Sequence, residues 1–339
     1  MTHSSRQIPM LACHHPGVRA VVVGAGVSGL SCARLLLHAG HDVTIVSGDA
    51  LHRTTSYLAA AVWFPTAAGP EEAVARWGAR TYDILAAEAR TRVPGVVMRE
   101  SLVLYRDAPS PSLPPPAWAA AVGEVRAADR EELPPGYARG LRFAVPLVEM
   151  PKYLPHLHQQ VVAAGGTQVV RRVTRLDDVL DLAPDVIVNA AGMGAGALVD
   201  DDTVYPVRGQ IVRVTNPGLT WSVRDEQHPG GRAYVHPRST DCILGGTLEE
   251  GSWNTEPDPA ETTAILERCT DIAPGLADAE VIDSVAGLRP GRPEVRVELE
   301  KDSMPVPVVH NYGHGGSGIT IGWGCAQEVA ALVAEVLRR

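Results

Sequence analysis

The sequence predicts an α/β protein in which a parallel-sheet domain is interleaved with a second domain built on an antiparallel sheet. Residues 18–46 follow a strand, helix and strand pattern, which is typical of a parallel sheet with a crossover helix. Residues 205–214 and 233–244 are strand-like runs with turn-forming residues between them, as in an antiparallel sheet. The short strand 185–189 and a final glycine-rich segment, followed by a helix from about residue 323 to 338, are expected to return the chain to the first domain.

Length, composition and charge narrow the class of protein. The chain has 339 residues, more than a single core usually fills, so two packed domains are expected. Hydrophobic residues make up 45% and charged residues 20%, and no run approaches the roughly 18 apolar residues of a membrane span. A formal net charge of −9 disfavours a nucleic-acid surface, which needs clustered cations. We therefore expect a small-molecule partner, with no nucleic acid and no membrane.

The first strand runs directly into the glycine pattern GAGVSG at 24–29, and an apolar helical segment follows it. Gly24 permits a tight turn, Gly26 lets the backbone approach a pyrophosphate, and Gly29 allows close packing of helix on strand. The helix N-terminus adds positive potential at the same place. Because the pattern lies between a strand and a helix, it predicts a Rossmann-like dinucleotide-binding unit rather than a structural turn.

The end of the second strand gives two candidates for the ligand of the adenosine ribose. An acidic residue usually ends this strand in nicotinamide-binding units. Here Val46 is followed by Ser47, Gly48 and Asp49, so the acid is displaced along the chain. Asp49 and Ser47 remain alternatives for this role.

Other segments mark the expected domain boundaries. Residues 1–16 are polar and lack an apolar core, so they predict a disordered extension and not a secretory signal. The run PSPSLPPP at 109–116 predicts a loop or linker. We expect residues 17–75, 150–204 and 284–339 to form the first domain, and residues 76–149 and 205–283 to form the second.

The cysteines and the chain terminus bear on the cellular compartment. The five cysteines are scattered and lack Cys-x-x-Cys spacing, so neither a metal site nor a disulfide framework is expected. The sequence ends in VLRR and not in a peroxisomal Ser-Lys-Leu signal. A reducing bacterial cytoplasm is the expected location.

Seven segments in a fixed order carry a family resemblance that extends over most of the chain. They are TTSYLAAAVWFP at 54–65, PLVEMPKYL at 146–154, VIVNAAG at 186–192, RGQI at 208–211, LGGT at 244–247, GLRPGRP at 287–293 and VHNYGHGGSGIT at 309–320. With this set the sequence resembles the D-amino-acid oxidase family. The resemblance implies non-covalent FAD, a flavin domain joined to an antiparallel substrate domain, and oxidation of D-amino acids by O2. It leaves the oligomeric state open, including a homodimer.

The same resemblance implies a set of cofactor-binding residues. Ser28, Thr54 and Thr55 are also polar neighbours of the glycine loop, with an ordinary surface loop as the alternative reading. Backbone at Ala61 and Val62 is expected beside the flavin ring, and Val173 near the adenine. The complete expected set is Gly24, Ala25, Gly26, Val27, Ser28, Gly29, Asp49, Thr54, Thr55, Ser56, Ala61, Val62, Val173, Gly192, Arg289, His314, Gly315, Gly316, Gly318, Ile319 and Thr320. The helix after the last glycines would aim its positive end at the flavin.

Three residues are expected to hold the substrate. The planar fork of Arg289 matches the two oxygens of a carboxylate, although a structural ion pair is the alternative. Tyr234 would donate a further hydrogen bond unless it faces a sheet neighbour. The backbone carbonyl of Gly316 would accept a bond from the substrate amine. His236 and His314 lie in matching segments, but a histidine in such a loop is more often a hydrogen-bonding structural group than a general base.

Two positions depart from patterns in the family. Many eukaryotic members carry a lid tyrosine where this chain has Gly230, so a shorter or differently closed lid is expected. D-aspartate oxidases place an arginine after Gly-Gly-Thr, where this chain has Leu248. Together with Phe64, this favours neutral D-amino acids, although Arg232 and Arg238 lie close enough in sequence to replace that arginine.

Other functions explain less of the sequence. A glycine or sarcosine oxidase would share the first loop and the C-terminal flavin segment without needing both GLRPGRP and NYGHGG. An NAD-dependent dehydrogenase would explain only the first strand, helix and strand. A non-catalytic flavin-binding protein would not need Arg289 beside Tyr234.

Overall fold

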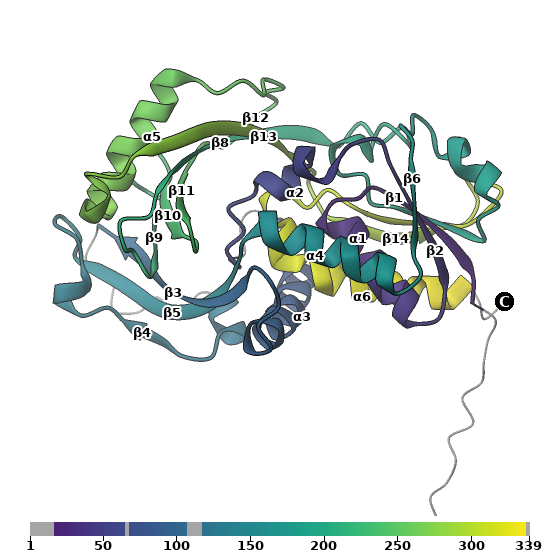
Figure 1. Cartoon of the computed structure of the whole chain (residues 1–339), viewed down its shortest axis with the longest axis horizontal. Coiled ribbons are helices and arrows are strands. Elements are labelled where there is room, and N and C mark those ends of the chain that lie inside the picture. The colour runs from purple at the N-terminus through teal and green to yellow at the C-terminus, as the bar shows by residue number, and fades with distance from the viewer. Residues whose placement is uncertain (1–16, 65–67, 107–116, 337–339) are drawn as a thin grey trace, which may run out of the picture.

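The computed structural model describes residues 17–64, 68–106 and 117–336 and contains two sheets that lie side by side (Figure 1). The predicted α/β class, with a parallel nucleotide-binding sheet interleaved with an antiparallel one, is confirmed. The expected disorder of residues 1–16 and the expected linker at 109–116 lie outside the described residues.

The first sheet collects strands from three distant parts of the chain. Its order is β14-β15-β7-β1-β2-β6, and all neighbours are parallel except β14 and β15. The strands are β1 (Arg19–Val23), β2 (Asp42–Ser47), β6 (Thr167–Val170), β7 (Val186–Asn189), β14 (Arg296–Glu300) and β15 (Val308–Tyr312). β1 and β7 are buried over nearly their whole length, which explains their continuous runs of valine and isoleucine.

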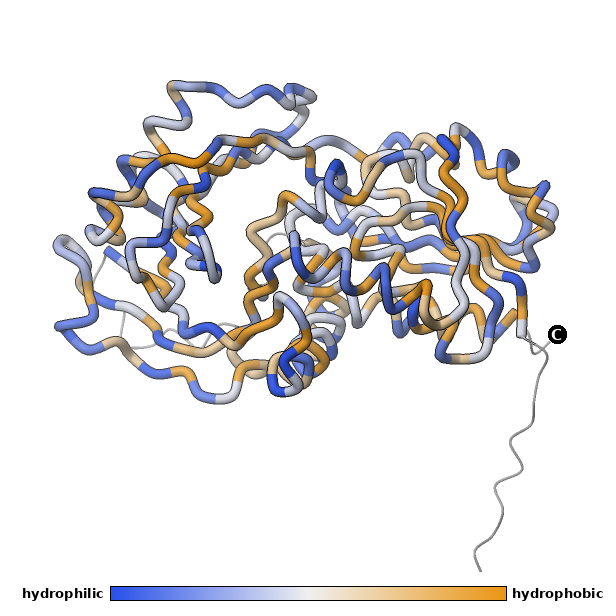
Figure 2. Tube along the Cα trace, viewed as in Figure 1, coloured by the Kyte–Doolittle hydropathy of each residue, from blue (hydrophilic) through white to orange (hydrophobic). Residues whose placement is uncertain are grey.

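Helices cover this sheet and carry its core. They are α1 (Val27–His38), α3 (Glu71–Arg90), α4 (Met150–Ala163) and α6 (Gly318–Val336), with the short α2 (Thr55–Leu58) between the two sheets. α1 packs against α4 and α6, and α3 packs against α6. Figure 2 shows hydrophobic residues concentrated along the strands of this sheet, where side chains of β1, β2, β7 and α1 form the largest buried cluster.

The second sheet is mainly antiparallel. Its order is β12-β8-β11-β10-β9-β3-β5-β4, β13 pairs with β8, and β3 and β9 are the parallel neighbours. Its strands are β3 (Val96–Tyr105), β4 (Val125–Ala127), β5 (Arg139–Val148), β8 (Tyr205–Thr215), β9 (Ser222–Asp225), β10 (Ala233–Pro237), β11 (Asp241–Gly245), β12 (Glu249–Glu250) and β13 (Val281–Gly291). Helix α5 (Pro259–Ile272) packs on β8, β10 and β11.

Two elements differ from the expected domain boundaries. The boundary between residues 283 and 284 falls inside β13, which pairs with β8 as far as Gly291. The boundary between residues 75 and 76 falls inside α3. This helix packs both on α6 of the first domain and on β3 and β5 of the antiparallel sheet. Each of these two elements therefore has residues on both sides of an expected boundary.

The C-terminal helix begins earlier than expected. α6 starts at Gly318 and not near Trp323, inside the glycine-rich segment. Its glycines allow close packing, since a Cβ at Gly324 would collide with the backbone of Trp77 in α3. Gly315–Val336 is also long and apolar enough to cross a membrane by length and composition alone, but half of its most apolar window is buried in the molecule.

Candidate active site

A cavity of about 560 Å³ extends from the loop after β1 to the face of the antiparallel sheet. It lies in the size range of small-molecule sites. Every expected site residue except Gly29 lines it. Gly29 acts as the sequence predicts for its position, because any side chain there would collide with the carbonyl oxygen of Gly24.

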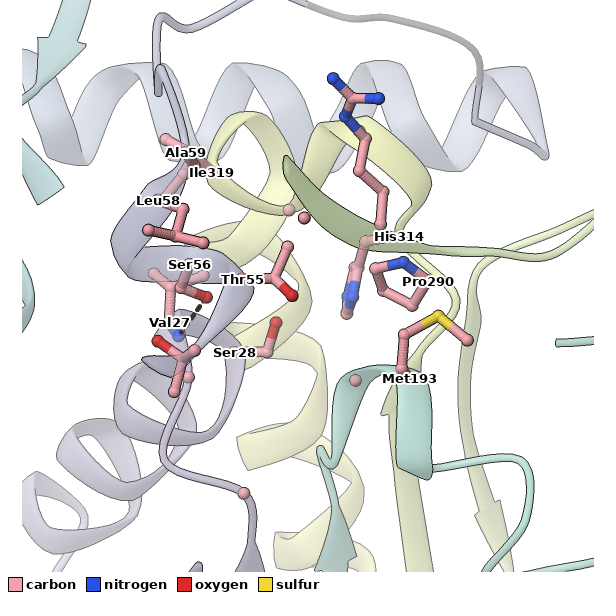
Figure 3. A pocket seen from close by; sticks show the side chains of 18 of the residues that line it. Val27, Ser28, Thr55, Ser56, Leu58, Ala59, Met193, Pro290, His314 and Ile319 are labelled. Atoms are coloured by element: carbon pink, nitrogen blue, oxygen red, sulfur yellow. Dashed lines mark hydrogen bonds between the residues drawn. The ribbon is translucent and has the colours of Figure 1, made fainter. Parts of the chain in front are cut away.

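The first wall is the turn between β1 and α1. Gly24 has a φ of 114°, and a Cβ there would collide with the carbonyl of Ala190. Gly26 precedes α1 without a side-chain cap, and the Val27 amide donates to Ser56 Oγ at 3.0 Å. Figure 3 shows Val27, Ser28, Thr55 and Ser56 around one space at this end of α1. The loop thus presents backbone and small side chains to a ligand.

The hydroxyls of Thr54 and Thr55 are less available than the sequence analysis expected. Thr54 Oγ1 donates to the Leu51 carbonyl at 2.7 Å and accepts from the Tyr57 amide, so it caps α2. Thr55 Oγ1 donates to the carbonyl of Leu288 in β13 at 3.0 Å. Both residues line the cavity, but their hydroxyl protons are used within the protein.

The adenosine end contains both ribose candidates. Ser47 Oγ donates to the backbone carbonyl of Asp49 at 3.2 Å, whereas the Asp49 carboxylate has no hydrogen bond within the described residues. Arg53 and Arg172 also line this end, and neither forms an ion pair in the described part of the chain. Sequence reasoning missed these two arginines, although each lies within a few residues of the end of β2 or β6.

The segment around Ala61 connects both domains at the centre of the cavity. Ala61 has a φ of 54°, its carbonyl accepts from the Val148 amide at 2.9 Å, and Val62 forms a bridge with Leu147. Thr320 in the first turn of α6 accepts from the Phe64 amide at 3.2 Å and donates to the Phe64 carbonyl at 3.0 Å. These bonds fix backbone at 61–64 against the N-terminus of α6.

His314 lies in the glycine-rich turn ahead of α6. It is 3% exposed, and its Nε2 lies 2.9 Å from Asn311 Oδ1. Because Asn311 Nδ2 donates to Cys32, its Oδ1 faces the histidine, which makes Nε2 the protonated nitrogen. Burial lowers the pKa of His314 to about 4. The ring, which is labelled in Figure 3, is therefore a neutral structural partner within the glycine-rich turn.

Arg289 and Tyr234 meet at the antiparallel sheet. Arg289 Nη1 donates to the Thr247 carbonyl at 3.0 Å, and no described carboxylate lies within ion-pair distance of its guanidinium. The group stands over Gly209, where any side chain would collide with it. Tyr234 is 8% exposed, and burial raises the pKa of its phenol while nearby Arg289 lowers it in part. Tyr234 thus stays protonated and can donate next to an uncompensated cation.

Other residues line the cavity beside Arg289 and Tyr234. His236 stacks on Tyr234 with ring centres 4.9 Å apart, and burial holds its pKa well below the ordinary value. Phe64, Leu248 and Arg232 line the cavity as expected, but Arg238 does not, since its guanidinium is buried against Asp241 at 2.6 Å. Arg224 and Glu226 also line the cavity, and sequence reasoning missed both.

The residues present fit a flavin dinucleotide. One end offers the amides of a helix N-terminus and unpaired arginines to phosphate groups, and the other offers Arg289 to a carboxylate. Between the two ends the cavity is lined by residues 59–62 and by His314, Ile319, Thr320 and the glycines at 315, 316 and 318. No cluster of three or more His, Cys, Asp or Glu that could hold a metal occurs among the described residues. Fold and cavity together define a dinucleotide-dependent oxidoreductase with a substrate-binding sheet.

Comparison with known proteins identifies the family within this class of oxidoreductases. The family model of FAD dependent oxidoreductases matches residues 19–332, so the chain belongs to the FAD-dependent D-amino-acid oxidase family. It is 51% identical to the D-amino-acid oxidase of Rubrobacter xylanophilus over 94% of this chain and 97% of that protein. It is 40% identical to the D-amino-acid oxidase of Streptomyces coelicolor (93% and 96% covered) and 36% identical to the D-aspartate oxidase of Homo sapiens (94% and 95% covered).

Solved structures agree with the fold. The glycine oxidase of Geobacillus kaustophilus matches with a TM-score of 0.76 at 21% identity, over 94% of this chain and 95% of the other. The iminodiacetate oxidase of Chelativorans matches with a TM-score of 0.76 at 23% identity and the same coverage. At this identity the likeness establishes the fold alone.

Proposed function

We propose that the protein oxidises D-amino acids to imino acids, which hydrolyse to 2-oxo acids and ammonia, while O2 is reduced to H2O2. The observation that carries this proposal is the cation of Arg289, without a carboxylate partner among the described residues, beside the protonated Tyr234 in the cavity that also holds the glycine loop. A free carboxylate on the ligand would supply the missing negative charge.

We propose that FAD is held non-covalently by the cavity walls. The amides at the start of α1 would receive the pyrophosphate, and Asp49 is better placed than Ser47 to accept from the ribose, because its carboxylate offers two charged acceptor oxygens without a hydrogen bond among the described residues, whereas Ser47 offers one neutral hydroxyl oxygen. Backbone at Ala61 and Val62 would lie beside the flavin ring, Val173 would lie near the adenine, and the glycines at 315, 316 and 318 would bring further backbone to the cofactor. When bound, the flavin would supply a two-electron acceptor, with N5 as the atom to which a hydride from the substrate Cα would pass, and O2 would be the final electron acceptor.

The protein would contribute orientation and charge placement to the reaction. Arg289 would bind the substrate carboxylate, Tyr234 would donate to the same group, and the Gly316 carbonyl would accept from the amine. Neither histidine is suited to remove the Cα proton, since burial lowers the pKa of both His236 and His314 and the protonated nitrogen of His314 is bound to Asn311. The substrate's own neutral amine lone pair would assist direct hydride transfer, and α6 would direct its positive end at the cofactor.

We propose that neutral D-amino acids are preferred. Leu248 places no charge on the wall after Gly-Gly-Thr, and Phe64 adds apolar surface. Arg232, which the sequence offers as a replacement for a cation at Leu248, forms an ion pair with Glu226 at 2.8 Å and is therefore already paired. The connection 226–232 between β9 and β10 is short, so substrate entry and product release would not depend on a long lid.

The test is an anaerobic absorbance spectrum of the purified protein before and after addition of D-alanine, D-methionine or D-aspartate, with L-alanine as the control. Bleaching of the flavin band by the D-isomers, fastest with the neutral ones, is the expected outcome. A flavin band that glycine bleaches and D-alanine does not would favour a glycine oxidase instead. Purified protein without a flavin band would contradict the proposal.

A further inference from the structure

Arg224 lines the cavity on the side of the antiparallel sheet, and not all of its guanidinium nitrogens have a hydrogen-bond partner in the part of the chain that the structure describes. It stands opposite Tyr234 in the antiparallel ladder of β9 and β10, so both side chains project from the same face of the sheet. Its side chain is 11% exposed, and its guanidinium carbon lies 3.9 Å from the ring centre of Phe64. Nη1 is buried and has no hydrogen-bond partner among the described residues. A buried donor of this kind is costly unless something offsets its charge.

Glu226 supplies that offset. Its Oε2 lies 2.8 Å from Arg232 Nε in an ion pair, and its Oε1 lies 3.7 Å from Arg224 Nε without a hydrogen bond. The carboxylate therefore sits between two guanidinium groups. Arg232 is 32% exposed at its side chain and is partly screened by water, whereas Arg224 depends mainly on Glu226.

Among the described residues, no other carboxylate of the cavity offsets the charge of Arg224. The described carboxylates that line the cavity belong to Asp49, at the end of β2, and to Glu226. Asp225 adjoins both residues in sequence but belongs to the other face of the sheet, where it accepts from Tyr137 at 2.6 Å and from Arg106 at 3.3 Å. Removal of the Glu226 charge would leave Arg224 unbalanced.

We propose that Glu226 determines specificity by acting as an internal carboxylate: it neutralises Arg224 and thereby closes a second anion site to the side-chain acid of dicarboxylic D-amino acids. The inference rests on the proposed function, because it assumes that the substrate occupies the space between Arg289 and Arg224. It places a latent dicarboxylate site in the same cavity. Arg289 would hold the first carboxylate, and the guanidinium of Arg224, which also lines the cavity, would hold the second once Glu226 is uncharged.

The first experiment compares kcat/KM for D-aspartate with kcat/KM for D-alanine in the holoenzyme. Glu226→Gln should raise this ratio about tenfold or more, the scale of a single buried charge pair. Adding Arg224→Met to Glu226→Gln should return the ratio to the wild-type value. Glu226→Asp, which keeps the charge, and Glu280→Gln, which removes one exposed carboxylate elsewhere, should leave it within about twofold of wild type.

A binding measurement separates charge recognition from turnover. Succinate and propionate lack an amine, so their affinities for the holoenzyme can be measured through the visible flavin band without oxidation. Succinate should bind more tightly relative to propionate in Glu226→Gln than in wild type. Unchanged ratios in both experiments, with an intact flavin spectrum, would overturn the role of Glu226. Absence of D-alanine oxidation by the wild-type enzyme would instead overturn the proposed function, and the succinate comparison would still test Glu226.

Discussion

At the scale of single residues, Arg289 carries the clearest expectation. Arg289→Leu removes the cation that would bind the substrate carboxylate, and loss of a buried charge pair costs about 2 kcal/mol or more, so kcat/KM for D-alanine should fall by about 30-fold or more. The visible spectrum should still show bound flavin. Arg80→Leu, at an exposed position in α3, is the matched control and should change neither quantity. If Arg289→Leu lost its flavin, Arg289 would have a structural role.

His314 should make stability depend on pH. Burial lowers the pKa of His314 to about 4 from an ordinary value of 6.5, so the unfolded chain takes up a proton first as the pH falls. Its contribution to the free energy of unfolding is complete above pH 6.5 and is lost progressively between pH 6.5 and about 4. His314→Gln should reduce this loss in urea unfolding of the apoprotein, measured near pH 7 and near pH 5.

The matched control for His314 is an exposed histidine. His38→Gln, at the end of α1, replaces an exposed imidazole and should leave the pH dependence close to that of wild type. Other buried histidines, His236 among them, also have lowered pKa values, so the dependence should become weaker in His314→Gln and not vanish. An unchanged slope would mean that the His314 ring takes up its proton as readily in the folded state as in the unfolded one.

Residue positions also show where sequence reasoning worked and where it failed. The glycine loop was predictable because its requirements are local: a turn at Gly24, a close approach at Gly26 and packing at Gly29. Arg224 was not predictable, since it faces the site only through its pairing with Tyr234 across two strands. Thr54 and Thr55 were expected among the cofactor-binding residues, but bonds to nearby carbonyls use the protons of their hydroxyls.

Among the elements, the contact between α3 and α6 gives a paired test. A Cβ at Gly324 would collide with the Trp77 backbone, whereas a Cβ at Gly322 in the same helix meets no atom within 4 Å. Gly324→Ala should therefore lower the free energy of unfolding by about 1–3 kcal/mol. Gly322→Ala should raise it by about 0.5–1 kcal/mol, because alanine loses less backbone entropy in a helix. Equal effects in urea unfolding would show that α6 can shift away from α3.

The strands of the antiparallel sheet were not equally predictable from the sequence. The alternation of residues 205–214 and 233–244 was enough to anticipate β8, β10 and β11. The expected domain boundary between residues 283 and 284 falls inside β13, whose segment GLRPG at 287–291 has two glycines and a proline and does not follow a strand pattern. Its ladder to β8 nevertheless extends to Gly291 and carries Arg289 into the cavity. Pairing along the full length of β8 outweighed the poor strand propensity of that segment.

At the scale of the whole molecule, residues of both sheets line the cavity, so a cofactor bound there would contact both domains. A ligand that binds only the folded state stabilises it by mass action, by about 2.7 kcal/mol at a concentration 100 times its Kd. The melting temperature of the apoprotein should therefore rise with added FAD and level off only slowly. Denaturation of the holoprotein in urea should release all of the flavin into the filtrate, because no covalent bond is expected. Flavin that remains with the unfolded chain would contradict non-covalent binding.

The position of β1 in the parallel sheet affects how the enzyme is made. β1 is the first strand of the described chain, yet its neighbours are β2 on one side and β7 on the other, and β7 in turn needs β15. During translation, the nascent glycine loop would gain β7 only after more than half of the chain had been made, and it would lack β15 and α6 until the ribosome had almost finished the chain. Capture of FAD would then be among the last events of biogenesis, and an early-terminated product could not retain the cofactor.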